Sequence, residues 1–278
     1  MRQDPNPPFN LVIDPTRAQQ QYLHDLYSFR ELFYFLAWRD IIVKYKQAFF
    51  GASWALLRPL LNMAVFAFLF GKVANLPSEG VNYALFVFAA LIPWQLYSGS
   101  AVDTCNCLVN NGTLITKVYF PRMIIPLAQI IVHLVDFTIT AIPLLVITIF
   151  LGYASWNLLA FPAFLALTTA FCIGTGLWLS ALTVQYRDFR IIVPFFVQFG
   201  MFISPVGYGT FLIPEKWLWL YCLNPLVGII DGFRWSLFGI GHDFLWYSIL
   251  SSVTVSCTLL ISGFFYFRNV ERTFADKI

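Results

Sequence analysis

Few side chains in this sequence have a type and spacing that could do chemistry. The nearest match to a phosphate-binding loop is Gly71-Lys72, which lacks a preceding Gly at the required spacing and a following Ser or Thr. A glycine-rich turn is what lets backbone N–H groups surround phosphates. We therefore expect any use of ATP to come from another chain.

Possible metal ligands and nucleophiles are scattered as well. Cys105 and Cys107 are separated by one residue, a spacing that suits neither a zinc site nor a redox pair. The three histidines, His24, His133 and His242, lie far apart in the sequence. We predict no catalytic residue, no metal site and no cofactor site in this chain.

One acid lies inside an apolar run. Asp136 follows His133 by three residues, so in a helix the two share a face. An ionisable residue within a membrane span is a candidate for function. Because a single carboxylate makes no proton relay, we favour a structural role, in which Asp136 pairs with His133 or with a Ser, Thr or Asn of a neighbouring helix.

Composition indicates which elements hold these side chains. The chain is 59% hydrophobic and 11% charged, whereas soluble domains carry about 25% charged residues. Lipid can accept this much apolar surface, while a soluble core of this size cannot. The sequence thus predicts an all-α integral membrane protein, and no nucleic acid partner is expected.

Six apolar runs are long enough to cross a bilayer, which takes about 20 residues. Together they define a transmembrane domain over 56–267. The runs are 56–73, 83–102, 123–151, 156–184, 191–212 and 244–267.

Lys and Arg residues indicate the orientation, since cytoplasmic loops retain them. With the N-terminus inside, 14 of the 17 Lys and Arg residues fall in the inside segments. We therefore predict that both termini are cytoplasmic. The inside segments are 1–58, 103–122, 185–190 and 268–278.

The apolar segment over about 213–241 is divided too often to be a seventh span. Asn224 suits a helix N-cap, Pro225 the first helical position and Gly239 the helix stop. A full crossing here would also move the basic C-terminal tail, 268–278, to the outside. We predict a re-entrant helical hairpin between the fifth and sixth spans.

Ahead of the first span, 1–25 reads as a polar cytoplasmic extension and 26–55 as an amphipathic helix at the membrane interface. Ser28 and Glu31 have capping-box spacing, and the apolar stripe changes phase at Arg39-Asp40, which predicts two helical pieces joined by a bend. Two roles remain open for this region, a membrane-surface anchor and a docking site for a partner.

Several motifs together resemble the permease subunit of ABC-2 type exporters of lipid-linked polysaccharide, such as O-antigen, capsule and teichoic acid exporters. The likeness extends over about 25–270. The motifs are Trp38-Arg39-Asp40, Tyr45-Lys46, Gly51-Ala-Ser-Trp54, Lys117-Val-Tyr-Phe-Pro-Arg122, Tyr186-Arg-Asp188, Ser204-Pro-Val-Gly-Tyr208, Asn224-Pro-Leu226 and Gly232-Phe-Arg234.

The resemblance implies a homodimer in the bacterial inner membrane that exports an undecaprenyl-linked glycan. It implies two separate P-loop ATPase subunits that hold ATP and Mg²⁺, and coupling through the loop between the second and third spans. Candidate coupling residues are Lys117, Tyr119, Phe120, Arg122, Arg39 and Asp40. The re-entrant gate would use Asn224, Pro225 and Arg234.

Aromatic residues suggest a translocation path. Phe195, Phe199 and Phe202 recur on one helical face, and Phe66 and Phe70 are four residues apart. Such rings could form a sliding surface for sugars, because ring faces require no fixed hydrogen-bond pattern. Contact with lipid or packing between helices is the alternative interpretation.

Other functions have weaker support. A polytopic enzyme acting on polyprenyl or acyl lipids would need clustered acids or a metal site, which Asp136 alone does not supply. An ion-coupled secondary transporter predicts inverted repeats, and none is evident. An ABC permease for a drug or a lipid remains the nearest alternative.

Overall fold

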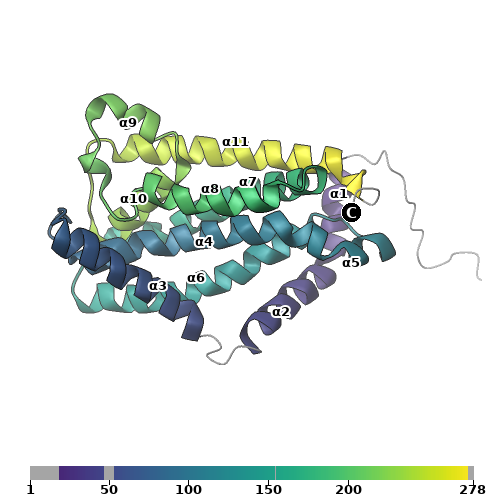
Figure 1. Ribbon diagram of the computed structural model, residues 1–278, viewed down its shortest axis with the longest axis horizontal. Coiled ribbons are helices and arrows are strands. Elements are labelled where there is room, and N and C mark those ends of the chain that lie inside the picture. Colours follow the sequence, from purple (N-terminus) through teal and green to yellow (C-terminus); the bar gives the residue numbers. More distant parts are fainter. Residues whose placement is uncertain (1–18, 47–52, 154, 275–278) are drawn as a thin grey trace, which may run out of the picture.

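The computed structural model describes residues 19–46, 53–153 and 155–274, and in this part of the chain it contains helices and no strands. The long helices lie side by side along the longest axis (Figure 1). They comprise α3 (Ser53–Phe66) with the π-helix η1 (Ala67–Val73), α4 (Tyr83–Asn110), α6 (Ile124–Phe150), η2 (Trp156–Ala160) with α7 (Phe161–Gln185), α8 (Phe189–Ile203) and α11 (Leu245–Glu271).

Five of these helices are long and apolar enough to cross a membrane, including the continuous stretches Ser53–Val73 and Trp156–Gln185. The predicted fifth span, 191–212, is only partly helical. Its helix, α8, has 15 residues, which cover about 22 Å of a hydrocarbon core about 30 Å thick. The sixth crossing therefore remains a prediction.

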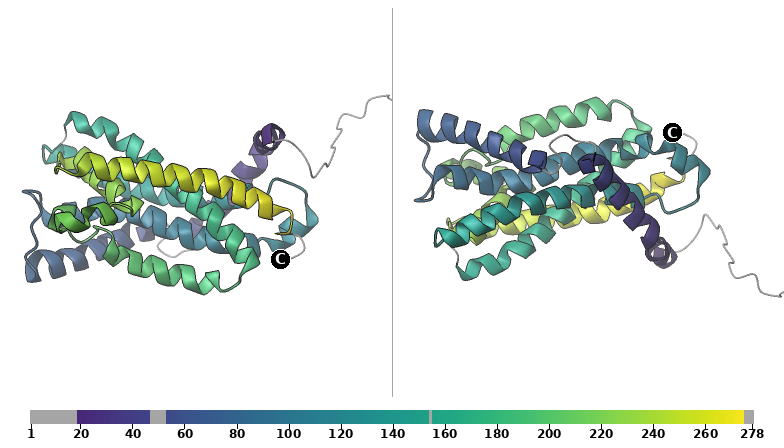
Figure 2. Two further views of the ribbon diagram at one scale, coloured as in Figure 1. Left: turned by 90° about the horizontal axis from the view of Figure 1, so that it is seen from above. Right: turned by 90° about the horizontal axis from the view of Figure 1, so that it is seen from below.

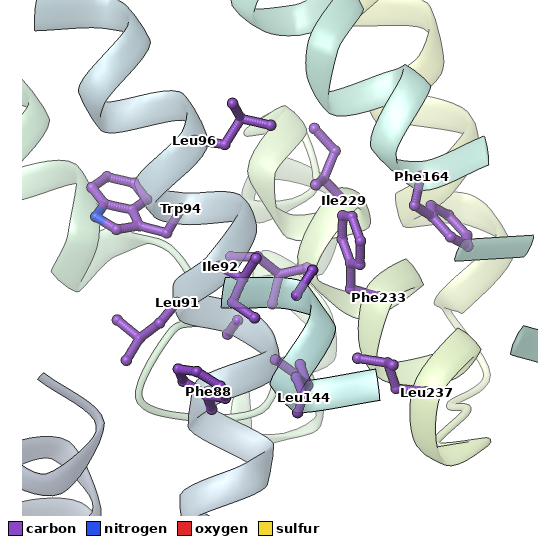
Figure 3. Close-up of a cluster of buried hydrophobic side chains, with 14 of the residues drawn as sticks. Phe88, Leu91, Ile92, Trp94, Leu96, Leu144, Phe164, Ile229, Phe233 and Leu237 are labelled. Atoms are coloured by element: carbon purple, nitrogen blue, oxygen red, sulfur yellow. The ribbon is translucent and has the colours of Figure 1, made fainter. Parts of the chain in front are cut away.

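The helix α4 lies at the centre of the packing. Two thirds of its most apolar window (67%) is buried, against 11% for the stretch Ser53–Val73. Figure 3 shows why: Phe88 and Leu91 of α4 meet Leu144 of α6 and Phe233 of α10 (Pro225–Phe238) in one cluster. The first span therefore leaves most of its surface to lipid or to another chain.

Small residues allow α7 and α11 to approach closely. A Cβ at Gly174 would lie 2.6 Å from the backbone nitrogen of Leu260, and one at Gly263 would lie 2.7 Å from the carbonyl oxygen of Gly174. Since lipid is as apolar as the side chains, close backbone packing of this kind is what holds membrane helices together.

The segment after α8 contains two short helices, α9 (Glu215–Tyr221) and α10. The expected helix limits are confirmed: the Asn224 side chain accepts from the Leu226 N–H, Pro225 begins α10, and Gly239 ends it with a φ of +70°. At 14 residues, α10 is about 21 Å long. Its re-entry into the membrane stays a prediction, and it lies at the end opposite to α5 (Gly112–Lys117) (Figure 1).

The expected bend near the N-terminus occurs at a different residue. The break lies at Phe29, between α1 (Gln19–Ser28) and α2 (Arg30–Lys46), and α2 continues through Arg39-Asp40. The Ser28 hydroxyl donates to the His24 carbonyl (2.9 Å) at the end of α1, so it does not cap α2. The change in apolar phase at Arg39-Asp40 therefore does not mark a break, because Asp40 and Lys44 bond to α6 while α2 stays helical.

The remaining boundaries differ mainly at helix ends. The second predicted span, 83–102, continues as α4 to Asn110, so the loop to α6 is short and contains α5. The predicted extension 1–25 and tail 268–278 lie partly outside the described residues, as does the start of the Gly51-Ala-Ser-Trp54 motif.

Candidate functional site

The loop between α5 and α6 has an exposed tip and a buried base. Tyr119 is 52% exposed and Lys117 is also exposed, whereas Phe120 is 3% exposed. Phe120 packs with Phe267 and Phe274 in a second apolar cluster. We expected Tyr119, Phe120 and Arg122 in a partner interface, but the structure places the Phe120 ring within this chain.

Arg122 holds the base of the loop to the end of α11. Its backbone N–H donates to the Glu271 carboxylate (2.6 Å), and its guanidinium donates to the Glu271 carbonyl. The Tyr22 hydroxyl of α1 donates to the same carboxylate (2.8 Å), and burial together with the charge of Glu271 raises the pKa of Tyr22. No sequence pattern pointed to Glu271, because its partners lie 149 and 249 residues away.

The helix α2 lies obliquely across the long helices (Figure 2) and is hydrogen-bonded to α6 and to Asn111, which follows α4. The Asp40 carboxylate forms an ion pair with its neighbour Arg39 (2.7 Å) and accepts from Gln129 of α6 (2.6 Å). Arg39 also donates to Asn111, next to α5 (3.3 Å). The two predicted coupling residues of α2 thus join α6 and the start of the predicted coupling loop.

One turn further along α2, Lys44 and Tyr45 both bond to Asp136 of α6. The Lys44 ammonium lies 2.5 Å from the carboxylate, and the Tyr45 hydroxyl donates to it. Burial and the hydrogen bond to Asp136 raise the pKa of Tyr45 above its ordinary range. His133 lies 3.6 Å from Asp136 and 2.7 Å from Asp103 of α4.

Asp136 therefore has a structural pairing with His133, as favoured from the sequence, but its main partners are on α2. These partners were not predicted, because besides His133 only Ser, Thr and Asn residues of neighbouring helices were considered as partners for Asp136. The interval of four residues between Asp40 and Lys44 was the available signal, since it puts both on one face of α2.

Arg234 of α10 is the largest fully buried side chain. Its guanidinium donates to the carbonyl oxygens of Phe86 (3.3 Å), Tyr208 (3.1 Å) and Val206 (3.1 Å) and lies 3.6 Å from the centre of the Phe86 ring. These contacts tie the loop after α8 to α4. Arg234 thus holds together the segment in which we predicted a gate.

A carboxylate next to Arg234 is shared by two further side chains. Asp231, also in α10, accepts from the Thr210 hydroxyl (2.9 and 2.8 Å) and lies 3.2 Å from the His242 ring. Asn224 bonds through its amide to Ser204 (3.0 Å). The connections before and after α10 are therefore attached to it by buried polar contacts.

The predicted path residues fall into two separate groups. Phe195, Phe199 and Phe202 are each more than half exposed, and the first two rings lie 4.6 Å apart. Phe66 and Phe70 instead pack over Gly207, where an added Cβ would lie 2.9 to 3.2 Å from their rings. In the described part of the chain no ring contact joins the two groups.

A neighbouring face of α8 lines a cavity of about 700 Å³ with α4, α7 and α10. Its lining is largely apolar, with Phe196 from α8, Trp94 and Tyr97 from α4, and Asn224-Pro225 at the start of α10. Across the described residues, no group of three or more His, Cys, Asp or Glu side chains could hold a metal ion.

Comparisons with known proteins agree with this architecture. The family described as ABC-2 type transporter matches residues 31–238. An O-antigen export system permease protein of Klebsiella pneumoniae is 30% identical over 86% of this chain and 91% of its own length. A second O-antigen export permease, from Myxococcus xanthus, is 28% identical over 76% of this chain and 82% of its own length. A polysialic acid transport protein of Escherichia coli is 20% identical over 69% and 76%.

Proposed function

The chain belongs to the ABC-2 type transporter family, and from this premise we propose that it is the membrane subunit of an ATP-driven exporter of lipid-linked polysaccharide. The substrate is an undecaprenyl-linked O-antigen or a similar glycan. The observation that carries this proposal is the likeness to O-antigen export permeases along most of the chain. The chain acts in transport and leaves ATP hydrolysis to a partner.

We propose that the working unit is a homodimer with two P-loop ATPase subunits, which hold ATP and Mg²⁺. It lies in the bacterial inner membrane with six spans and both termini inside. The exposed apolar face of α3 and η1 supports a second copy: Leu57, Leu61, Val65 and Phe68 recur along one side and are each more than a third exposed. Two copies would enclose the glycan path between them, with the exposed rings of α8 along it.

Coupling follows from the contacts at the cytoplasmic end. An ATPase that pushes on Lys117 and Tyr119 moves a loop whose base, Arg122, is bonded to α11 through Glu271. A push on α2 is passed to α6 through Asp136. Both inputs reach helices that pack on α4 or α7, so ATPase closure can shift the whole bundle.

The hairpin α9–α10 closes the outer end in this proposal. Asn224 and Pro225 begin α10 at the mouth of the cavity behind α8, and Arg234 keeps the preceding loop attached to α4. Opening of the path would move α10 together with this loop.

A reconstitution experiment tests the proposed function. The purified chain should hydrolyse no ATP alone and should acquire ATPase activity with a P-loop partner encoded beside it. That activity should rise with undecaprenyl-linked glycan and stay unchanged with phospholipid or an apolar drug. Hydrolysis by the single chain would contradict the proposal, conversion of a polyprenyl lipid by it would favour the lipid enzyme, and stimulation by a drug or phospholipid alone would favour the other class of permease.

A further inference from the structure

The end of α2 approaches the start of α3 (Figure 1). A cavity with several charged and amide residues in its lining lies between these two helices, α4 and α6. Its volume is about 250 Å³. Nothing in the proposed coupling requires a hollow at this place. Its charged and amide lining residues are Lys44, Arg58, Asn62, Gln95, His133 and Asp136.

In the predicted topology, the length of the first span puts the cavity near the cytoplasmic edge of the membrane. The stretch Ser53–Val73 has 21 residues, about 31 Å of helix, which matches a hydrocarbon core about 30 Å thick. Ser53 then marks the edge, which is the cytoplasmic one in the predicted orientation. Arg58 lies about 7 Å further along the axis, and a long Arg side chain at this depth extends towards the headgroups.

Three donors at this cavity lack an acceptor. The Gln95 amide nitrogen is buried and has no hydrogen-bond partner. Arg58 and Asn62 form no side-chain hydrogen bond or ion pair with another described residue. A buried donor left without an acceptor costs about 1–3 kcal/mol, a penalty that applies here to Gln95. Arg58 is exposed and Asn62 is half-buried, so both side chains are free to turn towards a ligand with acceptor atoms.

The acid at the cavity is already compensated. Asp136 accepts from Lys44 and Tyr45 and lies 3.6 Å from His133. This leaves the Arg58 guanidinium and two amides to face the ligand. A phosphate group carries negative charge and several acceptor oxygens, and it is the partner that a guanidinium fork matches best.

We propose that this cavity binds the phosphate group of a lipid, with Arg58 as charge partner and Asn62 and Gln95 as further donors. Two lipids place a phosphate at this depth. One is the polyprenyl carrier of the exported glycan, and this source rests on the proposed function. The other is a phospholipid of the cytoplasmic leaflet.

Binding to the full-length chain in detergent tests the proposal without any ATPase. The probes are farnesyl pyrophosphate, farnesol of the same chain length without phosphate, and a short-chain phosphatidylglycerol, each titrated by calorimetry. Farnesyl pyrophosphate should bind and farnesol should not. Phosphatidylglycerol that displaces farnesyl pyrophosphate supports the site with a phospholipid occupant, while failure to displace it supports the polyprenyl carrier.

Variants separate the site from general stability. Arg58→Gln should weaken farnesyl pyrophosphate binding about tenfold or more, and Arg58→Lys should lose less because it keeps the charge. Gln95→Leu should also weaken binding, yet leave the melting temperature of the ligand-free chain unchanged or higher, because it removes an unpaired buried donor. The matched control Arg187→Gln, at an exposed cytoplasmic Arg, should bind as the wild type does.

Equal binding of farnesol, or wild-type affinity in Arg58→Gln, would overturn the proposal. The two proposals fail separately. If the chain assembles with no ATPase but binds farnesyl pyrophosphate through Arg58, the result supports the phosphate site and contradicts the proposed transporter function. If the chain exports glycan but binds no phosphate probe, the result supports the proposed function and contradicts the phosphate site.

Discussion

The Lys44 ammonium of α2 lies 2.5 Å from the Asp136 carboxylate of α6, across 92 residues of sequence. The same carboxylate accepts from Tyr45, and His133 links it onward to Asp103 of α4. An acid inside an apolar helix is thus used to fasten a peripheral helix to two central ones. Because both contacts are polar and the surroundings are largely apolar, sliding of α2 along α6 would leave charges unpaired.

Exchange of these two charges tests whether they act as a pair. Asp136→Ala should lower the free energy of unfolding by about 1–2 kcal/mol, since it leaves three partners without an acceptor. Lys44→Asp alone should do the same through repulsion. The combined exchange Lys44→Asp with Asp136→Lys should recover part of the loss in thermal unfolding, and strictly additive losses would show that the pair contributes nothing.

Glu271 should matter for coupling as well as for stability. Glu271→Ala removes the acceptor for the Arg122 N–H and the Tyr22 hydroxyl, and we expect a loss of about 1.5–3 kcal/mol. Glu271→Gln keeps one acceptor oxygen and should lose less. In the assembled complex both Glu271 variants should lower the amount of glycan exported per ATP hydrolysed, Glu271→Ala more than Glu271→Gln. Glu215→Gln, at an exposed acid of α9, is the control. Export per ATP equal to the wild type in Glu271→Ala would limit this residue to stability.

The exposed tip of the coupling loop should form part of an interface. Tyr119→Ala should weaken binding of the ATPase partner roughly thirtyfold, as loss of an aromatic anchor commonly does. Membrane insertion should be unaffected. Tyr247→Ala is the matched control, since Tyr247 is 49% exposed against 52% for Tyr119 and lies in the first turn of α11, at the other end of the bundle. Equal affinity of both variants would show that the loop serves only the topology.

The exposed rings of α8 test the path. Replacing Phe195 and Phe199 together by Ala should slow glycan export roughly thirtyfold, because two ring contacts of about 1 kcal/mol each are lost. Membrane levels of the complex should stay normal, since both side chains are more than half exposed. Leucine at both positions should not restore export. Full rescue by leucine at normal expression would assign these rings to packing.

His242 gives a pH dependence to the outer hairpin. Burial lowers its pKa, but the hydrogen bond and charge of Asp231, with Glu79 and Asp243 nearby, outweigh burial and raise the pKa overall. Because the pKa of His242 is raised in the folded state, its pairing with Asp231 stabilises the fold fully below the unfolded-state pKa of ~6.5. This stabilisation is lost as the pH rises through the folded-state pKa. The melting temperature should therefore fall across that window.

His242→Gln should remove most of this pH dependence, while His24→Gln, at an exposed histidine of α1, should leave it intact. An unchanged pH profile in His242→Gln would show that another group titrates in this window.

Much of the helical layout was readable from hydropathy and local caps. Asn224, Pro225 and Gly239 delimit α10 as predicted, because N-caps, first-turn prolines and left-handed stops act within a few residues. The span ends were less predictable. The second run was expected to end at 102, but α4 continues to Asn110 because α6 and α7 cover it beyond the apolar run.

Candidate site residues divide in the same way. Two adjacent aromatic residues in a sequence do not reveal which one is exposed and which is buried. Only the fold decides that Phe120, and not Tyr119, meets the cluster of Phe267 and Phe274. Likewise, Arg234 was predicted to lie in a gate, and its three carbonyl partners come from α4 and from the loop after α8.

By itself the sequence determined the class of this protein: an apolar, helical membrane chain with cationic loops and no phosphate-binding loop. Those properties depend on composition and on neighbours within a turn or two. The pairing of Asp136 with Lys44, the joint at Glu271 and the unpaired donors around Arg58 were decided only by the tertiary structure. Each joins residues from different helices, and such contacts depend on which helix faces meet, which hydropathy does not specify.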